Sequence, residues 1–110
     1  MKGEIRVYTN LAGRWDIWKD DDVDLINVSR TVMTERMEIK YIFKSIDYDK
    51  ICTLTNFVAS RRNRIMEFYI NDKMMHRFNA TPGDVIIQEF HRDEECTVEV
   101  SFFVEVDEIC

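Results

Sequence analysis

The sequence predicts a mainly β fold of the α+β class: an antiparallel β-sandwich or barrel-like sheet with one short helix packed across it. Apolar and polar residues alternate with a period of two in several stretches, which is the pattern of half-buried strands. One stretch, residues 47–60, instead repeats its apolar residues with a helical period. We expect a single domain, residues 1–110, because 110 residues suit one hydrophobic core.

The clearest strand is expected at residues 97–106. Its apolar residues share one face and its polar residues the other, with Phe103 as the exception, so the apolar face should line the core. The residues of that face are Val98, Val100, Phe102, Val104 and Val106.

Further strands are expected where apolar residues alternate or cluster, at Met37–Phe43, Ile65–Ile70 and Asp84–Phe90. The order Pro82 then Gly83 predicts a type II turn that leads into the last of them. Residues 1–8 alternate from the start without an apolar signal segment, so we expect a protein that stays in the cytoplasm or in a particle assembled there.

The stretch 47–60 is compatible with a helix or a strand. Its apolar residues form a helical stripe, and Asp47 can cap the start, while Asn63 can end the helix in a left-handed conformation. Poor helix formers within the stretch favour a strand instead. We expect the helix, whose stripe is Ile51, Leu54, Thr55 and Val58.

Charge and cysteine content exclude several classes of protein. The formal net charge is −6 and the pI is about 4.9, which disfavours a general nucleic-acid binder, since phosphate contact needs a basic face. The three cysteines form no CxxC pair, so we expect free thiols and no structural zinc. No apolar run approaches the roughly 20 residues of a membrane helix.

Two segments contain residues that bind metals in other proteins, but neither has the spacing of a known metal site. Asp20, Asp21, Asp22 and Asp24 begin like a calcium loop, but the positions that need Gly and Glu hold Leu25 and Thr31, so a solvated acidic loop is expected. The segment between His91 and Cys96 has no standard ligand spacing and is expected to be a polar hairpin turn. Without a catalytic signature we expect neither an enzyme nor a cofactor.

Three features are candidates for protein contacts. Arg61, Arg62 and Arg64 either offset the dipole of the preceding helix or contact an acidic neighbouring subunit. Trp15 and Trp18 are expected to close one end of the core, and would be interface anchors if exposed. Core packing is also expected for a methionine-rich group, Met66, Met74, Met75 and Phe78.

The order of elements over residues 36–106 resembles the small minor tail proteins of long-tailed bacteriophages and the N-terminal domain of the distal tail protein family. The pieces that carry the resemblance are Met37–Phe43, Asp47–Ser60 with Leu54 and Phe57, Arg61–Arg64, Ile65–Ile70 and Thr97–Val106. The chain departs from the family habit at Arg61–Arg64, where a glycine turn is frequent, and residues 1–35 match nothing in it.

The resemblance implies a virion structural protein: a small tail or head–tail connector component, assembled in the host cytoplasm as a ring subunit. Its partners would be other copies of itself and neighbouring tail or connector proteins, with no specific nucleic acid and no membrane. The complementary charges of Arg61–Arg64 and Asp20–Asp24 would supply ring contacts. The alternative is a cytoplasmic binding or inhibitor module that acts on a partner protein through an acidic, β-rich surface.

Overall fold

The computed structural model describes residues 2–9, 13–61, 63–79 and 81–105. Within these ranges the chain forms seven strands, one α-helix and one 3-10 turn, in the order β1 (Lys2–Thr9), β2 (Arg14–Val32), β3 (Arg36–Ser45), α1 (Tyr48–Ala59), β4 (Ile65–Ile70), β5 (Lys73–Asn79), η1 (Pro82–Asp84), β6 (Val85–Arg92) and β7 (Glu95–Glu105).

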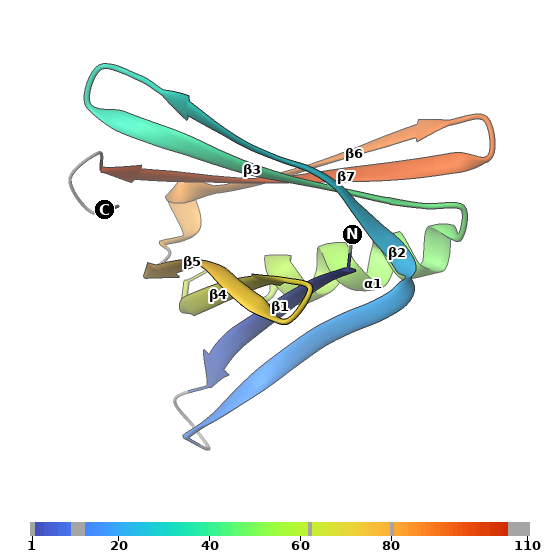
Figure 1. Ribbon diagram of the computed structural model, residues 1–110, viewed down its shortest axis with the longest axis horizontal. Coiled ribbons are helices and arrows are strands. Elements are labelled where there is room, and N and C mark those ends of the chain that lie inside the picture. Colours follow the sequence, from blue (N-terminus) through green and yellow to red (C-terminus); the bar gives the residue numbers. More distant parts are fainter. Residues whose placement is uncertain (1, 10–12, 62, 80, 106–110) are drawn as a thin grey trace.

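The described strands form one antiparallel sheet in the order β5-β4-β1-β2-β3-β7-β6. The sheet folds over at β2, whose first part pairs with β1 and whose second part pairs with β3. The register shifts between Lys2 and Glu4 and again between Leu25 and Asn27. Such irregularities bend a strand and increase its twist. Accordingly, β2 runs from the lower layer into the upper layer (Figure 1).

Two layers result from this fold-over. The upper layer contains the second part of β2 with β3, β7 and β6, and the lower layer contains the first part of β2 with β1, β4 and β5 (Figure 1). The helix α1 packs against β2, β3 and β7 and contributes to the same core. The predicted fold class, mainly β with one helix across the sheet, is confirmed.

Aromatic side chains join the two layers. Phe68 of β4 and Phe78 of β5 pack against Phe102 of β7, with ring centroids 4.9 and 4.5 Å from it. Tyr41 of β3 stacks on Phe68 at 4.2 Å. These rings are almost completely buried. Aromatic pairs of this kind stabilise a core beyond the area that they bury.

The predicted core faces of two strands are confirmed. On β3, alternate residues from Met37 to Phe43 are buried, and on β7 the residues Val98, Val100 and Phe102 are buried. Val104 is partly buried against the same core, and Val106 lies outside the described residues. The period of two therefore identified the inward face of both strands.

The helix prediction is confirmed, and its stripe packs inward through Ile51, Leu54 and Val58. Asp47 caps the start, because its Oδ1 accepts a hydrogen bond of 3.0 Å from the backbone N–H of Asp49. Burial of this face compensates for the poor helix propensity of the stretch.

The helix spans Tyr48–Ala59 with Ser60 as its C-cap, which agrees with the predicted bounds 47–60. Asn63 lies three residues beyond this cap, so it does not end the helix as expected. Ser60 caps the end through its backbone N–H, which donates to the carbonyl oxygen of Asn56, and Nη1 of Arg61 also donates to the carbonyl oxygen of Phe57 at 3.3 Å. A cation at this position also offsets the helix dipole.

Three other predictions are corrected. Residues 20–24 form part of strand β2, because they lie where β2 passes from pairing with β1 to pairing with β3, and they are not a loop. The turn before β6 is 3-10 and not type II, since Gly83 does not have the positive φ that type II requires. Met66 and Phe78 are buried as expected, but Met74 and Met75 are exposed, at the point where the register of β5 with β4 shifts.

Candidate functional site

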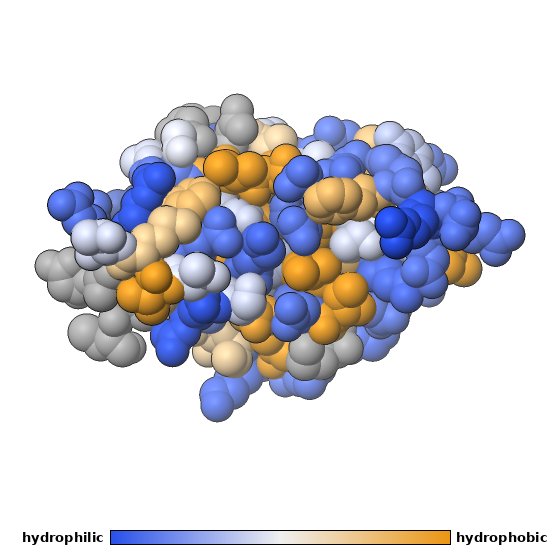
Figure 2. Space-filling model, turned by 90° about the horizontal axis from the view of Figure 1, so that it is seen from above, coloured by the Kyte–Doolittle hydropathy of each residue, from blue (hydrophilic) through white to orange (hydrophobic). Residues whose placement is uncertain are grey.

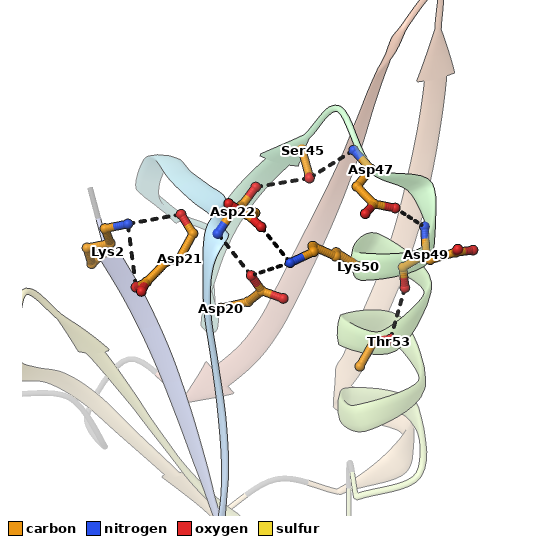
Figure 3. Close-up of polar contacts among 9 residues, drawn as sticks. All are labelled: Lys2, Asp20, Asp21, Asp22, Ser45, Asp47, Asp49, Lys50 and Thr53. Atoms are coloured by element: carbon orange, nitrogen blue, oxygen red, sulfur yellow. Dashed lines mark hydrogen bonds and ion pairs between the residues drawn. The ribbon is translucent and has the colours of Figure 1, made fainter.

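The acidic residues at the bend of β2 are paired within the chain (Figure 3). Lys50 of α1 places its Nζ 3.2 Å from Oδ1 of Asp20 and 2.6 Å from Oδ2 of Asp22. Lys2 of β1 donates to the carbonyl oxygen of Asp21 at 2.9 Å. The side chain of Asp24 is exposed. The cluster predicted to be a solvated acidic loop is therefore a contact that holds α1 and β1 against β2.

The pKa values at this bend agree with the pairing. A hydrogen bond from Lys50, followed by its charge, lowers the pKa of Asp22. Hydrogen bonds to Asp22 and Asp20 raise the pKa of Lys50. Ser45 adds a neutral link, because its hydroxyl donates to the carbonyl oxygen of Asp22 and accepts from the backbone N–H of Asp47. Both charged forms are thus stabilised by partners in the same chain.

The basic turn after α1 also has internal partners. The Nε of Arg61 lies 3.0 Å from Oδ2 of Asp16, and its guanidinium stacks over the ring of Phe57 at 4.4 Å. Arg64 is half-buried, and Arg62 lies outside the described residues. For Arg61, the contacts fit the interpretation in which it offsets the end of the helix. The structure does not bring Arg61 and the acidic Asp20–Asp24 segment together.

The two tryptophans have different environments. Trp18 is only 5% exposed and packs edge to face on Phe43, with ring centroids 5.5 Å apart. Trp15 is half-buried beside Tyr8, at 5.3 Å between centroids. Trp18 therefore belongs to the core, as the first interpretation predicted, and it is not accessible as an interface anchor. Trp15 keeps part of its surface open.

The segment from His91 to Cys96 is a hairpin turn between β6 and β7, as predicted. Its side chains form a hydrogen-bonded chain on the inner face. Nδ1 of His91 lies 3.3 Å from Sγ of Cys96, and Nε2 lies 3.3 Å from Oε2 of Glu89. The ring of Tyr48 lies 5.0 Å from that of His91. Since Cys96 is buried, these contacts pack the hairpin against α1. Among the described residues no group of three or more His, Cys, Asp or Glu side chains is placed so that it could hold a metal ion.

A second histidine links strand β5 to the core. His76 shares a short hydrogen bond through Nδ1 with the hydroxyl of Tyr41. Burial raises the pKa of Tyr41. Burial, followed by the charge of Arg30, lowers the pKa of His76. The neutral imidazole is therefore the form that this site favours.

The strand order places β5 and β6 at the two ends of the described sheet. Sheet edges carry unpaired backbone groups that can bind another strand. On β6 the residues Ile86 and Phe90 point to the outer face and remain 50% and 45% exposed, with Gln88 between them also exposed. Figure 2 shows that apolar side chains are scattered among polar ones over the upper layer.

The sequence predicts a strand over residues 84–90, but its pattern does not show that the outer face of this strand lies at an edge. Period-two alternation indicates which side chains share a face, whereas edge position depends on which strand lies beside it. Ile86 and Phe90, two large apolar residues on the polar side of that pattern, were the available signal.

One hollow of about 470 Å³ lies between the ends of β5 and β7. Its charged lining includes Arg36 and Arg77. The guanidinium of Arg36 stacks over Phe103 at 4.7 Å, and Nη1 of Arg77 lies 3.7 Å from Oε2 of Glu67. Both guanidinium groups therefore have partners, and the hollow contains no recognisable ligand cradle among the described residues.

In the part of the chain that the structure describes, no helix is long and apolar enough to span a membrane. Comparison with known proteins finds no family model, no curated protein and no solved structure that matches the chain.

Proposed function

We propose that this protein is a structural subunit that works by binding other protein chains, and that the edge of β6 is its main contact surface. The observation that carries the proposal is the exposed apolar pair Ile86 and Phe90 on an edge strand. Such an edge adds a strand from another chain through backbone hydrogen bonds, while its side chains select the partner.

The resemblance to small tail proteins supports the same class of function. It implies a tail or head–tail connector component in a virion, whose work is assembly with copies and neighbours. Assembly into a ring also needs a second contact, because a contact between identical surfaces closes at two copies.

The geometry favours the β6 edge over the charged segments as the contact surface. Asp20 and Asp22 pair with Lys50, and Arg61 pairs with Asp16. Breaking such internal pairs to form external ones returns little free energy, since exposed ion pairs contribute about 0–1 kcal/mol. The internal pairing also removes part of the acidic surface on which the alternative, an acidic binding module, depends.

Matched edge variants test the proposal. The double variant Ile86→Lys/Phe90→Lys places two charges on β6, and Met74→Lys/Met75→Lys places two on β5 at positions of similar exposure, 49% and 43%. We expect the β6 variant to weaken association by about 100-fold, as expected for the loss of central apolar contacts, and the β5 variant to leave it nearly unchanged.

Sedimentation velocity over a range of protein concentrations measures both variants, with circular dichroism as the control for folding. Equal weakening by both variants would contradict the assignment to β6. A wild-type protein that stays monomeric at the highest concentration, both alone and with the neighbouring proteins of its particle, would contradict the assembly function itself.

A further inference from the structure

The outer face of β6 is complementary to itself when two copies of the strand are aligned antiparallel. We propose that β6 of a second copy of this chain pairs with β6 of the first, about a two-fold axis that passes through Gln88. This inference rests on the proposed function, because it names the partner of the same edge. The upper layers of the two copies would then form one continuous sheet.

Side chains on the outer face determine the alignment. With Gln88 opposite Gln88 of the second copy, Ile86 lies opposite Phe90, and Phe90 lies opposite Ile86. Apolar pairs placed directly across an antiparallel ladder stabilise it. The alignment thus has a polar centre and an apolar pair on each side.

Other alignments lose these pairs. A shift of two residues in one direction places Ile86 opposite Gln88 and Phe90 opposite residue 84, which lies outside the strand. A shift of two residues in the other direction places Ile86 opposite Arg92. In a shift of one residue, backbone N–H and C=O groups that point away from β7 in one copy lie opposite groups that point toward β7 in the other. Ladder hydrogen bonds are then lost. The proposed alignment is therefore the one that side chains and backbone both favour.

The described residues leave this edge open. The register between β6 and β7 is unbroken from Val85 to Arg92, so the strand is regular along its whole length. The helix α1 packs against β2, β3 and β7, and it reaches β6 through inner-face contacts such as Thr55 with Glu89. A second β6 can thus approach in the plane of the sheet without displacing α1.

The interface is small, since β6 has only 8 residues. Interfaces at the low end of the size range are weak, so we expect a dissociation constant of about 1 μM to 1 mM. The association is best trapped covalently.

A disulfide at the two-fold axis tests the alignment. We would introduce Gln88→Cys in a background that carries Cys52→Ser and Cys110→Ser, and keep the buried Cys96. Residues opposite each other in an antiparallel pair have Cα atoms about 4.5–5.5 Å apart, within the range that a disulfide spans. We expect a cross-linked dimer on mild oxidation, seen as a doubled mass that returns to the monomer mass with reductant.

Ile86→Cys in the same background is the matched control. It lies on the same face with similar exposure, but the proposed axis separates the two copies of residue 86 by about 13 Å, too far for a disulfide. We expect at least tenfold less cross-linked dimer than with Gln88→Cys. The background without either change should remain monomeric on a denaturing gel.

The outcomes separate this inference from the proposed function. If the wild-type protein associates but Gln88→Cys does not cross-link, or if Ile86→Cys cross-links as well as Gln88→Cys, the two-fold alignment is wrong and the assembly function stands. If the protein associates with neither itself nor its neighbours, both are wrong.

Discussion

The two edge strands of the sheet, β5 and β6, are protected against pairing to different degrees. On β5 the register with β4 shifts between Phe68 and Tyr69, so that Met75 is an extra residue in a bulge. Bulges and charged side chains are the usual protection of a sheet edge, and β5 carries both. On β6 the register is unbroken and the exposed outer face holds Ile86 and Phe90.

The side chains around the two edges also differ: polar contacts surround β5, and apolar side chains remain open on β6. On β5, Arg77 pairs with Glu67 of β4, which is 8% exposed and also accepts a hydrogen bond from Tyr69. This edge is therefore tied into a polar network of its own layer. Next to β6, Lys40 of β3 pairs with Glu99 of β7, and the apolar pair on β6 is left open. The difference supports the proposal that a partner binds at β6.

Removal of the bulge should make β5 open to pairing, as β6 is. Deletion of Met75 would bring the pairs Phe68–His76 and Tyr69–Met74 into continuous register. A regular edge should gain self-association, by about three- to tenfold if one or two cross-strand pairs form. Sedimentation velocity measures the gain.

The new association should persist when Ile86→Lys/Phe90→Lys is added, because it uses the other edge. A deletion variant that folds, by circular dichroism, and associates no more than the wild type would show that the bulge does not protect β5.

Acidification should loosen β5, where His76 contacts Tyr41. Since the pKa of His76 is lowered from 6.5 in the folded protein, the unfolded chain binds more protons just below that pH. The contribution of His76 to stability is therefore present above pH 6.5 and is lost as the pH falls through 6.5 toward the lowered value.

Denaturant unfolding at pH 7.5 and 5.5, compared between the wild type and His76→Gln, measures this contribution, and His91→Gln is the matched control. Hydrogen exchange should accelerate at β5. An identical pH dependence in His76→Gln and in the wild type would contradict the role of His76.

The smallest effect is expected at the bend of β2, away from both edges. Lys50→Gln removes the ion pairs with Asp20 and Asp22 and should slightly lower the melting temperature without changing association. The pKa of Asp22 is lowered and that of Lys50 is raised, so the contribution persists between their ordinary values, 3.8 and 10.5.

This contribution is lost as the pH falls through the lowered pKa of Asp22 or rises through the raised pKa of Lys50. Melting curves at pH 3, 7 and 11 would check both limits. A change in association in Lys50→Gln would show that the bend contributes to the interface, contrary to the comparison of the two edges.

Local patterns allowed much of the fold to be predicted. The alternation in Met37–Phe43 and Val98–Phe102 identified inward faces, and the stripe of α1 with its cap at Asp47 identified a helix. These features depend on neighbours along the chain. Met75 was assigned to the core because nothing in its own segment shows that a bulge on an edge strand turns it outward.

The partners of the charged interface candidates could not be predicted from local patterns either. Asp20 and Lys50 are 30 residues apart, and Arg61 and Asp16 are 45 residues apart, so their pairing depends on how β2 bends. The sequence shows an acidic segment and a basic turn, but it does not show which groups their charges contact. In the folded chain most of the described ones have a partner.

By itself, the sequence determined that this chain is a mainly β domain, which faces of several strands are buried, and that a capped helix lies near the middle. Only the tertiary structure decided that β2 belongs to both layers, that Asp20, Asp22 and Arg61 are paired internally, and that β6 ends the described sheet with an open face. The physical reason is that side-chain periodicity is a property of consecutive residues, whereas an edge is defined by the absence of a neighbouring strand in space.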